Sequence, residues 1–538
     1  MQNTDQKQVY IAYASEGGNA QNLAKDFAKR CESLSIQTNI LPLNELSSQG
    51  FAKSRLICFV STTGNGEFPT NGKHFLSSNA FQQQNLDSLE YALFALGNRS
   101  YSQFCGAGKV LLQALQSENA QPITQPVFAD TEFHSIYANW ALEVLTELSG
   151  VHIDDLASSL EAFAEKPKAN YVLKNRIQLT DDSASKQTYH LMFEVAATSG
   201  IQRNEPLVYQ PGDVVSLDVN NPESWVEHLL GELDLEADAE ITFQQRTYSL
   251  QDYLTQKVEL SKINAEMIKK TGALLNNWDL LLKASKEKDL NALISMHDIF
   301  SWWSEYPIDV AQKYEWLLSL PLKKPRYYSV ASDSKSSANQ IHLTVGLQDF
   351  KSKLDEETPI KYGLASGFLC KQIQPNQISE LCLEAHPGFH LQMDKPMIWV
   401  ATGTGIAPFI GFLNRIAQTF PTERPAITLY FGVRHSEQDF LYKALLEDCA
   451  EQGLIDLKMA FSRQGEGCYV QDKLQMDIDI LSTLIKEQGH VYICGSEVMW
   501  DSVENVLQHA VLQSSEDIEE AKQKWLHFSS YQLHKDVY

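Results

Sequence analysis

The sequence predicts a multidomain α/β protein in which two domains with parallel sheets flank a β domain that carries a helical insertion. Three observations support this fold class. The chain has 538 residues, a length that suits about three domains. Buried-strand runs alternate with helical patterns near both ends of the chain, as is typical of parallel sheets. Strand patterns in the middle enclose a long stretch whose apolar residues recur at helical spacing.

The first domain is predicted over residues 1–150. Its strands are expected at 9–14, 55–60 and 91–96, where apolar runs end in glycine-containing loops. Apolar residues between Leu23 and Cys31 recur at helical spacing after the first of these strands. The pattern predicts a parallel sheet with helices on both faces.

The rest of the chain is predicted to form a linker and two further domains. Residues 151–168 are the expected linker, and residues 169–392 are expected to form a β domain with a helical insertion at 222–320. The strands predicted in this β domain are 189–195, 214–219, 327–330 and 341–347. Residues 393–538 are expected to form a second parallel domain, with strands at 397–401, 427–431, 457–461 and 491–494.

Charge and cysteine usage disfavour several classes of protein. The 68 acidic and 44 basic side chains give a formal charge of −24, which argues against binding to nucleic acids or to anionic membranes. The N-terminus has no apolar signal core, and the longest uncharged stretch, 396–413, contains turn residues unsuited to a membrane span. Eight cysteines are scattered without CxxC spacing, so we expect reduced thiols in a cytoplasmic protein, with no disulfide or metal site.

Three loops of the first domain contain residues suited to a phosphorylated aromatic ligand. They follow parallel strands whose carboxyl ends meet at one edge of the sheet. Backbone N–H groups at a helix start and the Ser15 hydroxyl can bind a phosphate, and the Tyr101 ring can stack on an aromatic ring. An ordinary glycine-rich turn and a Tyr101 that only packs its own loop are the alternatives. The candidate residues are Ser15, Glu16, Gly17, Gly18, Asn19, Ala20, Ser61, Thr62, Thr63, Gly64, Leu96, Gly97, Asn98, Tyr101, Phe104 and Cys105.

In their order, the three loops resemble those of flavodoxins, and in particular the flavodoxin domain of diflavin reductases. The resembling stretches are 15–20 (SEGGNA), 61–67 (STTGNGE) and 96–105 (LGNRSYSQFC). The resemblance implies that these candidate residues bind FMN. The family usually has threonine where this chain has Gly17, so this loop has one phosphate-contacting hydroxyl fewer.

Four motifs of the middle domain resemble those of ferredoxin-reductase-like flavoproteins. They are 209–213 (YQPGD), 326–332 (RYYSVAS), 344–346 (TVG) and 363–369 (GLASGFL). The resemblance implies an FAD site in which Arg326 binds the pyrophosphate, Tyr328 faces the isoalloxazine ring and Ser329 lies near flavin N5. The FAD-binding residues that it implies are Arg326, Tyr327, Tyr328, Ser329, Thr344, Val345, Gly346, Gly363, Leu364, Ala365, Ser366 and Tyr538.

The last domain resembles the NADP-binding half of the same flavoproteins. Residues 403–408 (GTGIAP) are similar to their dinucleotide turn, and the resemblance implies that Arg463 pairs with the 2′-phosphate while Tyr469 stacks on adenine. The family often has lysine at the position of Gly467, and Arg434 could compensate for its absence. The stretch from Cys494 to Met499 is one residue shorter than in related sequences. The implied NADP-binding residues are Gly403, Thr404, Gly405, Arg434, Ser462, Arg463, Tyr469, Gln471 and Asp501.

The ending Asp536-Val537-Tyr538 resembles the terminus of diflavin reductases, and Cys494-Gly495 resembles their CG motif. The resemblance implies that Ser329, Cys494 and Asp536 surround the hydride path as the catalytic residues. It also implies that Tyr538 covers the FAD ring until nicotinamide displaces it. A buried strand cysteine and a frayed chain end are the alternatives.

The resemblance extends from about Val9 to Tyr538. It implies a flavodoxin-like parallel sheet, an FAD-binding antiparallel β-barrel with a helical insertion, and a ferredoxin-reductase-like NADP-binding α/β domain. The implied activity is NADPH-dependent diflavin oxidoreduction, with electrons passing from NADPH through FAD and FMN to a metal-centre acceptor.

The acceptor is the least determined part of this expectation. Residues 469–474 and the ending are similar to those of the flavoprotein subunits of assimilatory NADPH–sulfite reductases, which implies a sirohaem sulfite reductase subunit as partner. A stand-alone reductase for another haem or cobalamin enzyme and a catalytically inert flavin-binding interaction protein are the alternatives. Glu67, Asp130 and Glu132 are candidates for a patch that docks the acceptor.

Overall fold

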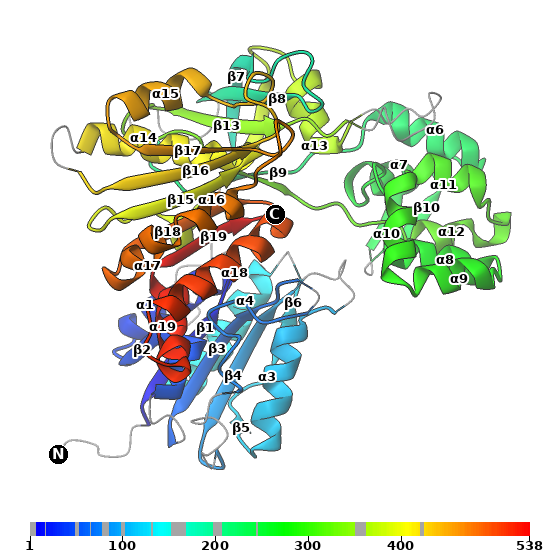
Figure 1. Cartoon of the computed structure of the whole chain (residues 1–538). Helices are drawn as coiled ribbons and strands as arrows, with labels where there is room; N and C mark the ends of the chain where they lie inside the picture. The colour runs from blue at the N-terminus through cyan, green and yellow to red at the C-terminus, as the bar shows by residue number, and fades with distance from the viewer. Residues whose placement is uncertain are drawn as a thin grey trace.

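The computed structural model describes residues 7–16, 18–48, 53–64, 66–77, 86–97, 103–130, 133–151, 168–196, 207–243, 246–349, 362–419 and 424–538. Within them, strands form sheets of six, two, six and five members. Figure 1 shows the first sheet beneath the last one, with the barrel above them and the helical insertion set off to one side. The predicted linker lies outside the described residues except for its two ends.

The first sheet is parallel and has the order β2-β1-β3-β4-β5, with β6 also paired to β4. Its strands are β1 (Val9–Ala14), β2 (Thr38–Pro42), β3 (Arg55–Ser61), β4 (Glu90–Leu96), β5 (Gln121–Pro122) and β6 (Val127–Ala129). Its helices are α1 (Asn19–Ser33), α3 (Gly106–Ser117) and α4 (His134–Ser149). The α1 and α4 helices pack on one face, where Phe27 and Trp140 contact Phe59, and α3 packs on the other through Leu111. The predicted parallel sheet with helices on both faces is therefore confirmed.

The second large sheet is antiparallel and closes into a barrel. Its order is β12-β9-β14-β7-β8-β13, and a bridge between Val330 and Leu343 joins its two end strands. A closed sheet leaves no unpaired edge and surrounds an apolar core that includes Leu191, Val215 and Leu343. The strands are β7 (Lys168–Gln178), β8 (Thr188–Val195), β9 (Val214–Leu217), β12 (Arg326–Ser329), β13 (Gln340–Gly346) and β14 (Ile378–Glu384), with the short helix α13 (Leu364–Gly367) beside them.

The insertion between β9 and β12 is mainly helical, as predicted, and has its own core around Trp302 and Trp316. Its helices are α6 (Glu223–Leu233), α7 (Leu250–Gln256), α8 (Ala265–Leu274), α9 (Trp278–Ala284), α10 (Glu287–Met296), α11 (Ile299–Glu305) and α12 (Lys313–Leu317). It also contains an antiparallel pair that the helical pattern concealed, formed by β10 (Glu240–Phe243) and β11 (Arg246–Ser249). Side-chain caps at Asn264, Asn277 and Asp298 begin α8, α9 and α11.

The last sheet is parallel, with the order β17-β16-β15-β18-β19. Its strands are β15 (Met397–Thr402), β16 (Ile427–Val433), β17 (Asp456–Phe461), β18 (His490–Gly495) and β19 (Leu533–Val537). Its helices are α14 (Ala407–Thr419), α15 (Lys443–Glu451), α16 (Val470–Met476), α17 (Ile478–Lys486), α18 (Glu497–Gln513) and α19 (Ile518–Tyr531). The β19 strand holds the end of the chain in the sheet, so the frayed terminus considered above is wrong.

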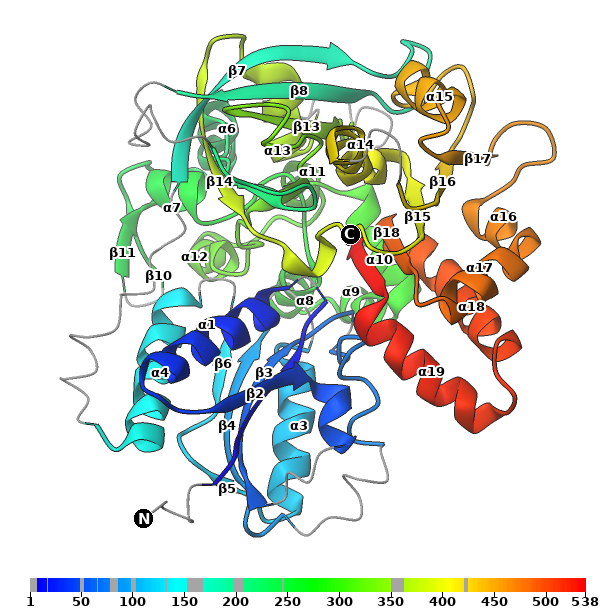
Figure 2. The same cartoon turned by 90° about the vertical axis from the view of Figure 1, so that its left-hand side faces the viewer.

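The first sheet's domain lies against the rest of the chain. Asn22 Nδ2 donates to the Ala385 carbonyl oxygen (3.4 Å), and Lys535 Nζ donates to Thr70 Oγ1 (2.8 Å). Tyr531, at the end of α19, hydrogen-bonds Glu45. Figure 2 shows α19 and the β19 strand next to the first sheet's domain. Among the described helices, none is long and apolar enough to cross a membrane.

Candidate functional site

A cavity of about 1100 Å³ lies between the barrel and the last sheet. The barrel contributes β12 and β13, and the last sheet contributes the loops that follow β15, β16, β17 and β18. The end of the chain completes the lining with Asp536, Val537 and Tyr538. The cavity therefore lies at the carboxyl edge of a parallel sheet, where open α/β sheets usually bind ligands.

Two of the three predicted catalytic residues, Ser329 and Asp536, line this cavity, and the third, Cys494, is fully buried beside Asp536. Ser329 Oγ donates a hydrogen bond to Asp536 Oδ2 (2.5 Å), and Cys494 Sγ lies 3.8 Å from the same oxygen. The parallel register pairs Cys494 of β18 with Asp536 of β19 and fixes this approach. Burial, with Asp536 beside it, raises the pKa of the Cys494 thiol well above its usual range, so the thiol stays neutral at neutral pH.

The last residue, Tyr538, lies over the cavity. Its backbone N–H donates to the Gly495 carbonyl oxygen (3.0 Å), and its hydroxyl shares a hydrogen bond with Thr404 Oγ1 (2.7 Å). The residue, which carries the terminal carboxylate, is nevertheless 61% exposed. Tyr538 is thus held at two points while much of its surface stays accessible.

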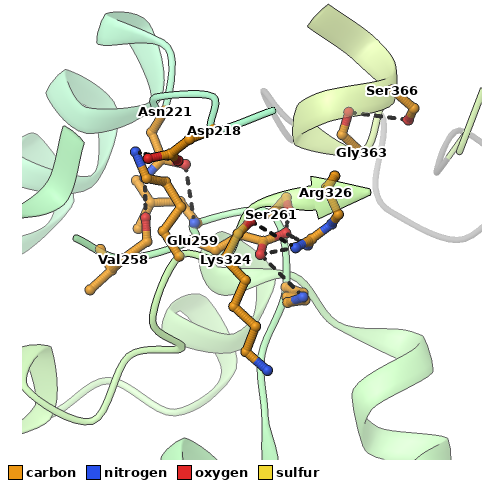
Figure 3. A network of polar contacts seen from close by, with 12 residues as sticks. Asp218, Asn221, Val258, Glu259, Ser261, Lys324, Arg326, Gly363 and Ser366 are labelled. Carbon is orange, nitrogen blue, oxygen red and sulfur yellow. Dashed lines mark hydrogen bonds and ion pairs between the residues drawn. The ribbon is translucent and has the colours of Figure 1, made fainter. Parts of the chain in front are cut away.

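Arg326 is positioned by a buried carboxylate. Arg326 donates to both oxygens of Glu259 (2.7 Å each) and to the Lys324 carbonyl oxygen (3.1 Å), as Figure 3 shows. Burial alone would raise the pKa of Glu259, but Lys262 and Arg326 more than offset it and the net direction is down. Burial, together with Lys262 and Arg326, lowers the pKa of Lys324 to about 8. The cluster gathers positive charge, and the motif that identified Arg326 gave no sign of Lys324.

The predicted FAD residues fall into two groups. Six of them line the cavity: Tyr327, Tyr328, Ser329, Thr344, Gly346 and Tyr538. Arg326 and residues 363–366 do not, and Figure 3 shows Gly363 and Ser366 on a helical turn near Arg326. Val345 is buried in the barrel core, so its side chain serves packing.

The predicted NADP residues are also divided. Gly403, Thr404, Arg434, Ser462, Tyr469 and Gln471 line the cavity. Arg463 lies next to it and donates to the Tyr469 hydroxyl (3.3 Å), while Arg434 donates to Ser185 Oγ. Gly405 packs so closely on β18 that a Cβ would lie 2.1 Å from the Cys494 carbonyl oxygen, which only glycine allows.

Asp501 is not brought to the cavity. It is exposed on α18, whose Val498, Met499 and Ser502 line the cavity instead. Asp501 acts electrostatically on Glu504, as does Glu67 of the first domain. Thr402, Gln348 and Ser496 also line the cavity, although no motif pointed to them.

The first domain's loops contain buried hydroxyl groups without partners. Among the described residues, Ser15 Oγ and Thr62 Oγ1 are buried and make no hydrogen bond. Gly18 precedes α1 with a φ of +79°, and no side chain caps that helix. Unsatisfied buried hydroxyls are rare, and phosphate oxygens would satisfy these two, so the loops fit the phosphate of FMN.

Other predicted FMN residues have partners of their own. The Glu16 carboxylate accepts hydrogen bonds from Thr70 N–H (2.9 Å) and Thr70 Oγ1 (3.2 Å) and pairs with Lys535. Ser61 Oγ donates to the Ala14 carbonyl oxygen (3.1 Å), and Thr63 bridges to Glu67. Gly17, Asn98 and Tyr101 lie outside the described residues.

The remaining predicted FMN-binding residues lie in these loops or at the ends of the helices and strands that the loops connect. Asn19 and Ala20 begin α1, Leu96 ends β4, and Gly64 has a φ of +51°. Cys105 precedes α3 and contacts Gly97, where a Cβ would lie 2.5 Å from the Cys105 nitrogen. Phe104 lies 5.6 Å from the ammonium group of Lys109.

The acidic side chains predicted to dock an acceptor differ in exposure. Glu67 is exposed and lies within electrostatic reach of Glu504 on α18, whereas Asp130 is half-buried and lies within electrostatic reach of Lys324. Glu132 lies outside the described residues.

All eight cysteines are free, and every one of them lies in a described segment. Among the described residues, no group of histidine, cysteine, aspartate and glutamate side chains could hold a metal ion.

Comparison with known families matches three successive parts of the chain. A model described as flavodoxin matches residues 11–161, an FAD binding domain matches 295–368, and an oxidoreductase NAD-binding domain matches 399–505. Their order is that of the first sheet, the barrel and the last sheet.

Curated relatives match over nearly the whole chain. One from Mannheimia succiniciproducens is 29% identical over 98% of this chain and 90% of its own length. One from Vibrio cholerae is 28% identical over 90% and 80%, and one from a Shewanella species is 28% identical over 98% and 89%. Each is named sulfite reductase [NADPH] flavoprotein alpha-component. The three domain matches in this order, together with these relatives, identify the chain as a diflavin reductase, an NADPH-dependent flavoprotein reductase whose cofactors are FMN, FAD and NADPH.

Proposed function

We propose that this reductase receives hydride from NADPH in the cavity between the barrel and the last sheet and supplies electrons to the sirohaem subunit of a sulfite reductase. The hydride site is assigned here because Ser329 Oγ and Cys494 Sγ both contact the same oxygen of Asp536. The flavins, when bound, accept two electrons together from nicotinamide and release them singly, which a metal centre requires.

The three side chains act by positioning and by charge. The Asp536 carboxylate stabilises the positive charge that develops on the nicotinamide ring as hydride leaves. The Ser329 hydroxyl and the neutral Cys494 thiol orient that carboxylate and give the nicotinamide a fixed boundary. None of the three needs to act as a nucleophile.

Tyr538 acts as a movable cover in this proposal. The ring is held through one hydrogen bond from its hydroxyl to Thr404, and the residue as a whole is 61% exposed, so nicotinamide can displace the ring. The cost of this displacement is met by binding energy from the rest of NADPH. Ser462, Arg463 and Tyr469 supply this energy at the other end of the dinucleotide, where a guanidinium pairs well with a phosphate.

The first domain holds FMN in the proposal. Its phosphate takes the place at the start of α1 where the Ser15 and Thr62 hydroxyls have no partner. Tyr328 and Thr344 of the barrel would hold FAD, and Arg326 and Lys324 would bind its pyrophosphate. We take residues 1–150 as the FMN domain, 151–168 as the linker, 169–392 as the FAD domain and 393–538 as the NADP domain.

The proposed electron acceptor is inferred from the relatives and not from the residues that line the cavity. Their names describe the flavoprotein component of an NADPH–sulfite reductase, and the match covers most of each of those chains. Glu67 is exposed in this arrangement and can meet basic residues of another protein, whereas Asp130 is half-buried and lies within electrostatic reach of Lys324.

The test mixes the purified protein with NADPH, sulfite and a sirohaem sulfite reductase subunit. We expect NADPH oxidation that depends on both sulfite and the subunit, and that slows in a Cys494→Ala variant. If NADPH reduces the flavins but no sulfite-dependent oxidation follows, the reductase serves another acceptor. If NADPH does not bleach the flavins, the hydride site itself is wrongly assigned.

A further inference from the structure

His386 is buried where the first domain meets the barrel. It lies in the connection between β14 and β15 and is 4% exposed. Its backbone N–H donates to Asp213 Oδ1 (2.9 Å), which fixes the turn. Among the described residues, neither nitrogen of its ring has a hydrogen-bond partner of good geometry. A buried imidazole without a hydrogen-bond partner is unfavourable. A bound ligand with an acceptor atom would satisfy the ring N–H of His386.

The His386 ring lies at the start of α1. Its Cδ2 atom is 3.1 Å, and its Nε2 atom 3.8 Å, from the position that a Cβ on Gly18 would occupy. Gly18 is the residue before the 15-residue helix α1, which has no side-chain cap. The free N–H groups at such a helix end attract an anion.

Two further side chains of the first domain's loops have buried hydroxyl groups without hydrogen-bond partners. Ser15 Oγ lies in the loop that leads to Gly18, and Thr62 Oγ1 lies in the neighbouring loop after β3. Because β1 and β3 are parallel neighbours, with Ala14 paired to Val60, the loops that carry these two hydroxyls lie side by side, and His386 lies at the helix start that follows one of them. A phosphate monoester has enough acceptor oxygens to satisfy all of them.

The chain holds this arrangement together from both sides. Asn22 Nδ2, on α1, donates to the carbonyl oxygen of Ala385, the neighbour of His386. On the other side of the loop, Glu16 pairs with Lys535 of β19. The phosphate loop is thus clamped between the 385–390 turn and the last strand.

The surroundings of His386 favour the neutral form of its imidazole, which can donate one hydrogen bond. Burial lowers the pKa of His386, His390 acts in the same direction, and Asp536, Asp213 and the Gly212 backbone oppose them. A neutral imidazole still has one N–H to donate, and its other nitrogen needs no second proton for that bond.

We propose that His386 donates a hydrogen bond to the phosphate of FMN, so that a residue of the barrel completes the phosphate site of the first domain when the two are docked. The inference rests on the proposed placement of FMN at Ser15 and Thr62. It also accounts for Gly17, where related sequences usually have threonine, because the imidazole supplies a donor in place of the missing hydroxyl.

The test compares FMN with riboflavin, which lacks the phosphate. Both are titrated onto the full-length protein depleted of FMN, and binding is followed by quenching of flavin fluorescence. We expect His386→Ala to weaken FMN binding by about 10–100-fold, as for a hydrogen bond to a charged group, and to leave riboflavin binding unchanged. His386→Asn, which keeps an N–H donor, should restore part of the loss.

Two further variants separate the possible failures. Ser15→Ala should weaken FMN binding but not riboflavin binding, and His509→Gln, at an exposed position of α18, should change the affinity for neither flavin. Equal weakening of both flavins by His386→Ala, or no change in FMN affinity, would overturn the inference while leaving the FMN placement intact. If Ser15→Ala also spares FMN, the placement itself fails. Should His386→Ala fold poorly, the phosphorus resonance of bound FMN in His386→Asn must still shift; an unchanged resonance counts against the contact.

Discussion

Ser329 donates a 2.5 Å hydrogen bond to Asp536, although the two residues are 207 positions apart in the chain. Ser329 ends the β12 strand of the barrel, and Asp536 belongs to β19 at the edge of the last sheet. The bond therefore joins two independently cored sheets across the cavity. Any relative movement of the barrel and the last sheet would separate the proposed catalytic groups.

Replacing the buried thiol tests its part in hydride transfer. We expect Cys494→Ala to slow flavin reduction by NADPH about 10–100-fold, equivalent to roughly 1.4–2.7 kcal/mol of transition-state stabilisation. Stopped-flow absorbance of the flavins measures this rate. Cys449→Ala, which removes a buried thiol from α15, is the matched control and should react at the wild-type rate. A wild-type rate in Cys494→Ala would remove the thiol from the site.

Removing the covering ring should relax the choice of nicotinamide. We expect Tyr538→Ala to raise kcat/KM for NADH relative to NADPH, because displacing the ring no longer consumes binding energy that only NADPH provides. Tyr538→Phe keeps the ring but loses the hydrogen bond to Thr404, so its ratio should fall between the other two. An NADH/NADPH ratio identical to wild type in Tyr538→Ala would show that the ring does not gate the site.

The exposed arginine beside Tyr469 should carry the preference for the 2′-phosphate. We expect Arg463→Ala to raise the KM for NADPH about 10-fold or more and to leave the KM for NADH unchanged, because a charge-assisted bond to phosphate is lost. Arg434→Ala tests the alternative cation in parallel. A larger loss of NADPH selectivity in Arg434→Ala than in Arg463→Ala would reverse the assignment.

The ion pair between Glu16 and Lys535 should hold the first domain against β19. Both side chains are mostly buried, and removing one partner of a buried pair typically costs about 3–5 kcal/mol. We therefore expect Lys535→Met to open this contact and to speed hydrogen exchange at the Thr70 amide, which donates to Glu16. Adding Glu16→Gln should recover part of the protection. Unchanged exchange in Lys535→Met would show that the pair contributes nothing to docking.

Acid should weaken the fold through His534. Burial, aided by His490, lowers the pKa of His534 to about 3, against about 6.5 in an unfolded chain. Between these values the folded protein binds fewer protons, so the stability that neutral His534 contributes is complete above pH 6.5 and declines toward pH 3. His534→Phe keeps the stacking on Tyr492 and should show a shallower fall in unfolding free energy between pH 7 and pH 5. An exposed histidine replaced in the same way, His509→Phe, should retain the wild-type slope.

The parallel strands were predictable because they are buried on both faces. Such strands read as continuous apolar runs, as in β1 and β15, and their carboxyl-end loops then gather at one edge. The β19 strand was not predictable in this way, since Leu533–Val537 places three consecutive polar or charged residues between two apolar ones at a sheet edge. Only the likeness of its ending to a known motif pointed to Asp536.

Residues brought together from distant segments mark the limit of the sequence analysis. The sequence around His386 does not indicate that its ring faces Gly18. The two residues are far apart in the chain, and each belongs to a domain built on a different sheet. Asp501 illustrates a different failure. One residue fewer before it rotates a helical position by about 100°, which is enough to turn its side chain from the cavity lined by Val498 and Ser502.

The most direct test of the account is the flavin that the purified protein releases on denaturation. The placement of FMN in the first domain and FAD along the barrel predicts one FMN and one FAD per chain. It also predicts that Ser15→Ala loses FMN while retaining FAD, because Ser15 belongs only to the first site. Release of FAD alone from the wild-type protein would contradict the account, since the first domain would then take no part in electron transfer.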